Sequence, residues 1–204
     1  MTAVTQNHHD HHEEHDHHVE EANKVIFGFW LFLMSDCIIF AVLFSCYFVL
    51  KDNTFGGIGI HQVASLPYVL IMSLVLLTSS LTYGLGFLSF RNSKQCSAYG
   101  WFLVTFLLGL LFVVMTYIEL SELVSMGQDW TKSAFLSSFF TLISFHALHV
   151  IIGLCWMVVM ALQMACPRYK AFLDKRLTCL GLFWNFLDLV WIFIFTFVYL
   201  MGAI

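Results

Sequence analysis

Long apolar runs separated by short polar segments make up most of this chain. A helix rises about 1.5 Å per residue, so a run of about 20 residues crosses the hydrocarbon core of a bilayer, which is about 30 Å thick. Five runs reach that length, and they cover residues 25–50, 67–90, 99–120, 134–165 and 178–202. Because the loops between them are short, consecutive helices should be antiparallel neighbours. The pattern predicts an all-α integral membrane protein, built as a bundle of five transmembrane helices.

The composition agrees with a membrane protein and excludes a water-soluble globular one. Hydrophobic residues make up 60% of the chain and charged residues 11%, whereas a soluble domain carries roughly 25% charged residues. We therefore expect a single multi-pass transmembrane domain over residues 25–204 and no nucleic-acid partner. The six cysteines form no CxxC pair, so we interpret them as small hydrophobic residues without disulfides.

Residues 1–24 form a segment of a different kind. They hold seven of the ten histidines of the chain, interleaved with acids, and they show no apolar periodicity. They also lack the basic start and apolar run of a secretory signal. Histidine-rich tracts can bind zinc or copper ions, but nothing in this segment fixes a coordination geometry. We favour a disordered, solvated, cytoplasmic tail, with metal binding as the alternative.

Lysine and arginine residues are distributed unevenly between the two sides of the predicted bundle. The side of the predicted bundle that is opposite the N-terminus has only Lys51 and Lys132. The side of the N-terminus has seven basic residues: Lys24, Arg91, Lys94, Arg168, Lys170, Lys175 and Arg176. Short loops rich in lysine and arginine stay in the cytoplasm. We therefore predict that the N-terminus is cytoplasmic and the C-terminus periplasmic.

Two acids lie deep in the predicted helices. Asp36 lies about 16 Å from the cytoplasmic start of its helix, and Asp188 lies about 15 Å from the start of its own. A carboxyl group at that depth is costly in lipid, so each acid should face protein or a wet cavity. The matched depth leads to the hypothesis that Asp36 and Asp188 approach each other.

Glu119, His146 and His149 lie nearer the outer face, about 25–30 Å deep by the same count. Their depth allows Glu119 to meet either histidine, and we favour a structural hydrogen bond or ion pair over proton transfer. The two histidines are three residues apart, so they share one face of their helix, which Gly153 and Trp156 continue. That face is as typical of helix packing as of a ligand site.

We do not expect a redox centre within this chain. Two histidines that lie three residues apart on one helix cannot take opposite axial positions on one haem. No other predicted helix supplies a histidine as the second ligand, and copper or non-haem iron would also lack ligands. The sequence therefore predicts no catalytic residue, no metal site and no cofactor in this chain.

Three stretches of the chain resemble one protein family. They are IFGFWLFLMSDCIIFAVLF (Ile26–Phe44), FLSSFFTLISFHALHVIIGLCWM (Phe135–Met157) and LFWNFLDLVWIFIFTFVYLMG (Leu182–Gly202). With them, the chain resembles subunit III of the haem–copper terminal oxidases, and in particular the five-helix subunit III of bacterial cytochrome bo-type ubiquinol oxidases. The resemblance runs from about Lys24 to the C-terminus, and the histidine-rich tail also fits the bo-type form.

The resemblance implies a non-catalytic subunit of a proton-pumping quinol oxidase of aerobic respiration, in the bacterial inner membrane. Oxidase subunits I, II and IV would be its partners, the haems and copper would lie in the catalytic subunit I, and phospholipid would bind this chain. The implied roles are to stabilise the catalytic subunit and to support proton uptake. Asp36 is the implied residue for proton uptake, while Trp30, His146 and His149 are candidates for lipid-headgroup or structural contacts.

The chain departs from the family pattern at two positions. Asn185 stands where the family often has histidine, which excludes a titrating role there but not a hydrogen bond. Asp36 stands where the family often has glutamate, so its carboxylate reaches one methylene less far. An alternative from another class is an independent proton or cation transporter, with Asp36, Glu119 and Asp188 along its path. Transporters often show internal repeats or broken helices, and this sequence pattern shows neither.

Overall fold

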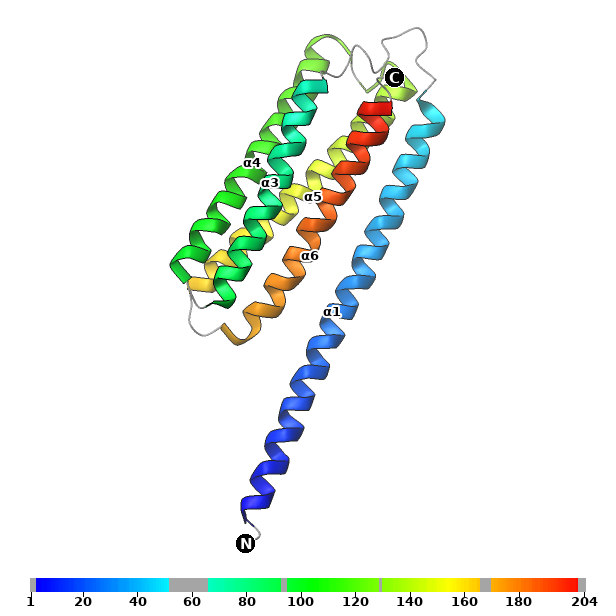
Figure 1. Cartoon of the computed structure of the whole chain (residues 1–204). Coiled ribbons are helices and arrows are strands. Elements are labelled where there is room, and N and C mark those ends of the chain that lie inside the picture. Colours follow the sequence, from blue (N-terminus) through cyan, green and yellow to red (C-terminus); the bar gives the residue numbers. More distant parts are fainter. Residues whose placement is uncertain (1–2, 52–65, 93–94, 129, 166–169, 202–204) are drawn as a thin grey trace. The chain divides into compact units, whose positions relative to one another are not determined.

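The computed structural model describes residues 3–51, 66–92, 95–128, 130–165 and 170–201. Within these residues the chain forms helices and turns, and no strand. The elements in chain order are α1 (Ala3–Leu50), α3 (Leu66–Arg91), α4 (Gln95–Ser125), α5 (Ala134–Ala165), α6 (Lys170–Ile194) and the π-helical η2 (Phe195–Leu200) (Figure 1).

Five of the described helical segments are long and apolar enough to cross a membrane. They are Lys24–Leu50, Leu66–Arg91, Cys96–Ser125, Ala134–Met164 and Leu173–Leu200. Each overlaps one of the five apolar runs of the sequence, so the predicted all-α architecture of five transmembrane helices is confirmed. The orientation of the two termini across the membrane stays a prediction.

Some helices extend beyond the predicted runs. Helix α6 begins at Lys170, inside the predicted fourth loop, because charged residues there continue the helix past the apolar part. Helix α1 begins at Ala3 and so includes the histidine-rich segment. The side chains of residues 1–23 lie outside the described part of the structure, and the disorder of the tail stays a prediction.

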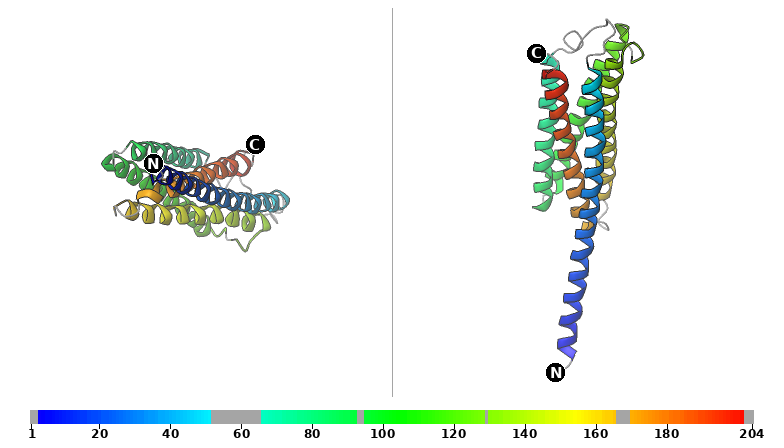
Figure 2. Two further views of the ribbon diagram at one scale, coloured as in Figure 1. Left: turned by 90° about the horizontal axis from the view of Figure 1, so that it is seen from below. Right: turned by 90° about the vertical axis from the view of Figure 1, so that its right-hand side faces the viewer.

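The chain divides into two compact units, Met1–Cys37 and Ile38–Ile204. The first unit consists of the N-terminal part of α1. In the second unit, α3 packs against α4, α4 against α5, α5 against α6, and α6 against α3. Figure 2 shows these four helices lying side by side. Together they enclose the core of the second unit.

Trp184 of α6 connects all four helices of this core. Its indole N–H donates a hydrogen bond of 3.0 Å to the Ser79 hydroxyl of α3. Its ring lies against Gly109 of α4 and Gly153 of α5, where an added Cβ would come within 2.9 and 3.0 Å of ring atoms. With 1% of its surface exposed, the indole fills a socket that needs glycine on both neighbouring helices.

Further hydrogen bonds join α3 to α6. The indole N–H of Trp191 donates to the Ser73 hydroxyl at 2.9 Å, and the Tyr83 hydroxyl donates to the Leu177 carbonyl at 2.7 Å. The hydrophobic effect does not hold helices together in lipid, so packing and interhelical hydrogen bonds do so, each bond contributing about 0.6 kcal/mol on average. These two contacts fix the antiparallel register of α3 and α6.

Residues 38–50 of α1 belong to the second unit and pack through aromatic rings. The Phe40 ring lies edge-on to Phe145 of α5 and to Phe186 of α6, with centroids 5.5 and 6.3 Å away. The Tyr47 ring lies 6.1 Å from Phe135 of α5. This part of α1 is therefore held against α5 and α6.

The turn between α4 and α5 has well-formed caps. Gly127 has a φ of +72°, a conformation that favours glycine. The Gly127 N–H donates to the Val124 carbonyl at 2.9 Å, and the Gln128 N–H donates to the Leu123 carbonyl at 3.0 Å, which satisfies carbonyls at the end of α4. At the start of α5, the Ser133 hydroxyl accepts from the Leu136 N–H at 3.1 Å, as an N-cap does.

Candidate functional site

Asp36 and Trp30 belong to the first unit. Asp36 is buried, with 5% of its surface exposed. Trp30 is 47% exposed. The hypothesis that Asp36 approaches Asp188 stays a prediction, because Asp188 belongs to the other unit.

His146 is enclosed in the second unit between α5 and α6. Its Nε2 lies 3.2 Å from the Leu187 carbonyl oxygen, and because a carbonyl only accepts, Nε2 carries the proton and donates. The ring is fully buried and lies edge-on to Phe112, 5.8 Å away, and tilted against Trp191, 5.3 Å away. These contacts favour the structural role over a lipid-headgroup contact for this histidine.

His149 lies on the same face of α5, one turn further along. Its Nδ1 lies 2.9 Å from the Phe145 carbonyl oxygen of its own helix, so Nδ1 carries the proton. The ring packs against the Phe145 ring, with centroids 4.7 Å apart, and against the Phe40 ring, 5.4 Å away. The ring orientation is therefore set by the helix backbone and two phenylalanines.

Glu119 contacts a residue that the sequence did not single out. The Tyr199 hydroxyl lies 3.2 Å from both carboxylate oxygens of Glu119 and donates to them. Both residues are buried. The sequence allowed Glu119 to meet His146 or His149, and a contact with His149 stays a prediction. The π-helical turn of η2 directs Tyr199 towards α4, and His146 is instead bonded to α6.

Asp188 and Asn185 lie on α6 beside Ser80 of α3. The Ser80 hydroxyl donates to the Asn185 side-chain oxygen at 2.5 Å. Asp188 is buried, with 6% of its surface exposed, whereas Asn185 is exposed. The structure therefore gathers three polar groups on the α3–α6 seam.

The described residues contain no group of three or more His, Cys, Asp or Glu side chains that could hold a metal ion. The buried histidines make backbone hydrogen bonds, as described above. The histidine-rich segment lies outside the residues whose side chains the structure describes, so metal binding there stays the alternative.

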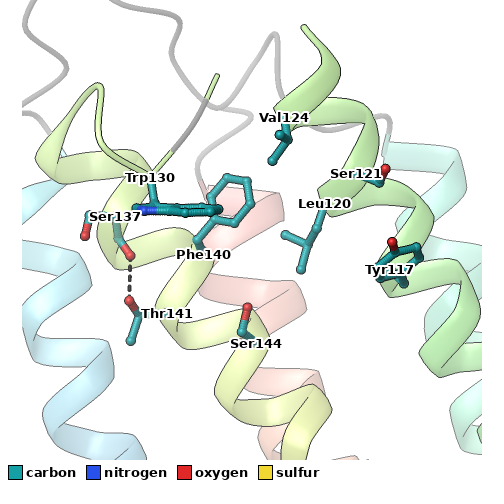
Figure 3. A pocket seen from close by; sticks show the side chains of 9 residues that line it. All are labelled: Tyr117, Leu120, Ser121, Val124, Trp130, Ser137, Phe140, Thr141 and Ser144. Atoms are coloured by element: carbon teal, nitrogen blue, oxygen red, sulfur yellow. Dashed lines mark hydrogen bonds between the residues drawn. The ribbon is translucent and has the colours of Figure 1, made fainter. Parts of the chain in front are cut away.

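A pocket of about 600 Å³ lies between the end of α4 and the start of α5 (Figure 3). Figure 3 shows the Trp130 ring beside Phe140, with the Ser144 hydroxyl below them. None of the predicted site residues is among its described lining residues, and none of those described residues is an acid, a base or a cysteine. The lining is aromatic, aliphatic and hydroxylated: Tyr117, Leu120, Ser121, Val124, Trp130, Ser137, Phe140, Thr141 and Ser144.

A second cavity, of about 520 Å³, lies between the other ends of α4 and α5. Its lining is almost entirely apolar and consists of Tyr99, Phe102, Leu103, Phe106, Met157, Val158, Ala161 and Leu162. The described lining suits a hydrocarbon chain and includes no acid, base or cysteine for acid–base or nucleophilic catalysis. Neither cavity resembles an active site.

Sequence reasoning missed Tyr199 and Ser80. Nothing in the sequence marks Tyr199, because a π-helical turn shifts the face on which a side chain lies, and the apolar pattern does not reveal that turn. Ser80 did carry a signal, since Ser79 and Ser80 are adjacent hydroxyl residues in the middle of an apolar run. Both serines bind side chains of α6.

Comparison with known proteins agrees with the resemblance seen in the sequence. The family described as Cytochrome c oxidase subunit III matches residues 3–203. Cytochrome bo(3) ubiquinol oxidase subunit 3 of Pseudomonas aeruginosa is 46% identical over 100% of this chain and 99% of its own length. The protein of the same name from Pseudomonas putida is 42% identical over 91% of this chain and 89% of its own length. Quinol oxidase subunit 3 of Bacillus subtilis is 38% identical over 87% of each. The chain therefore belongs to the cytochrome c oxidase subunit III family.

Proposed function

We propose that this chain is the non-catalytic subunit III of a proton-pumping quinol oxidase in a bacterial inner membrane. The observation that carries the proposal is the match to relatives named as subunit 3 of quinol oxidases over nearly the whole length of both proteins. In this role the chain stabilises the catalytic haem–copper subunit and supports proton uptake. Its partners are the oxidase subunits I, II and IV.

The polar groups of the second unit support a structural subunit over an independent transporter. His146 bonds to the backbone of α6, and Glu119 receives the Tyr199 hydroxyl, so both hold helices together. The hydroxyls of Ser73 and Ser79 likewise accept bonds from tryptophans. A transport path needs polar groups that exchange partners, whereas these groups are fixed by packing.

Asp36 is the residue we propose for the support of proton uptake. It is the one acid in the apolar part of α1, it is buried, and it matches the position of the acid in the family signature. A carboxyl group at this depth is typical of a functional site in a membrane protein. Trp30, which is half exposed, remains a candidate for a lipid contact.

We also propose that phospholipid binds this chain. The apolar cavity between α4 and α5 supports this proposal, because its volume and lining suit an acyl chain. The site would take one hydrocarbon chain between Phe106 and Met157 on facing helices. Mass spectrometry of the gently extracted chain should show a bound phospholipid that Ala161→Trp, which fills this cavity, reduces.

A purification from membranes tests the proposed function. The chain, carrying an affinity tag, is extracted in mild detergent together with whatever binds it. We expect haem absorbance and quinol-dependent oxygen consumption in the eluate, in a constant ratio to the chain. A chain that elutes pure and colourless, with ion flux after reconstitution into vesicles, would support the transporter instead.

A further inference from the structure

Asn185 is a polar side chain exposed near the middle of the membrane. It lies twelve residues into the span Leu173–Leu200, which corresponds to a depth of about 18 Å. Ser80, which donates to its side-chain oxygen, lies about 16 Å from Arg91, at the same end of the bundle. A carboxamide at that depth is costly when it faces lipid, because its N–H groups find no acceptor there.

Asp188 adds a second unsatisfied group beside it. It lies three residues after Asn185 and so on the same face of α6. Asp188 is buried, with 6% of its surface exposed. Among the described residues, its Oδ1 has no hydrogen-bond partner. Ser80 donates its one hydroxyl proton to the Asn185 side-chain oxygen, so that proton is not available to Asp188. The bond from Ser80 engages only the oxygen of Asn185, and one oxygen of Asp188 has no hydrogen-bond partner among the described residues.

Another exposed polar residue of α3 behaves differently. Thr78 lies two residues before Ser80 and is also exposed. Its hydroxyl donates to the Leu74 carbonyl of its own helix at 2.7 Å, so it can face lipid at little cost. A carboxamide cannot satisfy both of its N–H groups in that way. Asn185 therefore requires a partner from outside the α3–α6 seam.

The part of α1 in the second unit does not supply that partner. Phe186, the residue after Asn185, packs against Phe40 of α1. Consecutive residues on a helix point about 100° apart, so residues 38–50 of α1 lie on a neighbouring face of α6 and leave Asn185 exposed. Among the described residues of the second unit, none of α1 covers the face of Asn185, which is thus open to another polypeptide.

We propose that Asn185, which the Ser80 hydroxyl holds in place, forms a contact point for a membrane-spanning helix of a partner subunit. The partner places a side-chain amide or hydroxyl at the same depth, where its oxygen accepts from the exposed Asn185 amide. A neutral group of this kind both donates and accepts, and it adds no further charge to the membrane interior. The inference rests on the proposed function, because it requires a multi-subunit complex.

The Asn185→Leu variant tests the contact point in the intact complex. The readout is the amount of haem-containing partner that co-purifies per chain present in the membrane. Loss of interhelical hydrogen bonds should lower that ratio roughly three- to twentyfold. Thr78→Val is the matched control, since it removes an exposed hydroxyl already bonded to its own helix, and its ratio should equal that of the unsubstituted chain. An unchanged ratio for Asn185→Leu would overturn the contact point.

Photo-crosslinking decides the matter if Asn185→Leu lowers the membrane level of the chain itself. A photoreactive amino acid is placed at position 185 of the full chain in native membranes. An adduct with another polypeptide is the expected result. Adducts with lipid alone, or with residues 1–37 of this chain, would overturn the proposal. If the unsubstituted chain brings down no haem, the proposed function fails; if it does and position 185 meets only lipid, the contact point alone fails.

Discussion

Replacing Gly109 by alanine should destabilise the bundle, because the new methyl group collides with Trp184. The Cβ of alanine would lie 2.9 Å from Leu154 Cδ2 and 2.9 Å from Trp184 Cη2. The leucine methyl lies at the end of a flexible side chain and can turn away. The indole cannot retreat, because Gly153 lies against its other edge and Ser79 holds its N–H.

The expected loss of stability follows from overpacking in a rigid core. Forcing one extra methyl group into a well-packed interior costs about 1–3 kcal/mol. For a chain of this length, each kcal/mol lowers the midpoint of thermal unfolding by about 2–4 °C. The Gly109→Ala chain should therefore unfold at a temperature lower by roughly 4–8 °C, for a loss of about 2 kcal/mol.

The assay heats the purified protein in mild detergent and follows the loss of the chain from its monodisperse size-exclusion peak. Gly84→Ala is the matched control, since nothing lies within 4 Å of a Cβ at that position. Alanine has the higher helix propensity, so this variant should be unchanged or slightly more stable. Equal midpoints for Gly109→Ala and Gly84→Ala would refute the socket around Trp184.

A double-mutant cycle then identifies the colliding group. Trp184→Phe removes the outer ring atoms that the new methyl would meet, and it also removes the hydrogen bond to Ser79. It is destabilising by itself, but Gly109→Ala should cost little in its background. The two changes should differ from additivity by about 0.5–3 kcal/mol, the range for residues in contact. Additive losses would show that the collision lies elsewhere.

Three further changes have expected outcomes. Tyr199→Phe leaves the buried Glu119 without its hydroxyl donor and should cost about 1–3 kcal/mol in the same thermal assay, and a second change, Glu119→Leu, should restore most of the loss. Ser73→Ala removes the acceptor of the Trp191 N–H and should cost about 0.6 kcal/mol, with 1.7 as the upper bound; a larger loss would indicate a role beyond this hydrogen bond. Asp36→Asn should leave co-purification with the haem partner intact but change proton uptake or the durability of turnover, measured as oxygen consumption over repeated additions of quinol. Loss of co-purification would instead make this acid structural.

Hydropathy predicted the five spans because lipid imposes a length and an apolar composition on every membrane helix. It also selected the buried polar groups, since any polar side chain deep in an apolar run must be enclosed or partnered. His146, Glu119 and Asp188 are all buried in the structure. Depth alone was therefore sufficient to predict that these residues lie inside protein.

Depth could not predict which groups meet. The partner of Glu119 is Tyr199, and that contact depends on a π-helical turn which no pattern in the sequence marks. The socket of Trp184 depends on glycines from two other helices. Both arrangements depend on the direction of each side chain and the approach of neighbouring helices, which an apolar pattern leaves open. The hydropathy pattern did not predict the start of α6. Charged residues extend this helix beyond the apolar run, and a charged segment between apolar runs has the composition of a loop.

The central claim is that this polypeptide serves an oxidase without holding a redox centre of its own. The most direct test strips the chain from its co-purified companions in detergent and measures iron and copper by mass spectrometry, together with haem absorbance. The account predicts both metals well below one atom per chain and a colourless protein, while the companion fraction retains the haem. Iron or copper bound in stoichiometric amount to the separated chain would contradict it.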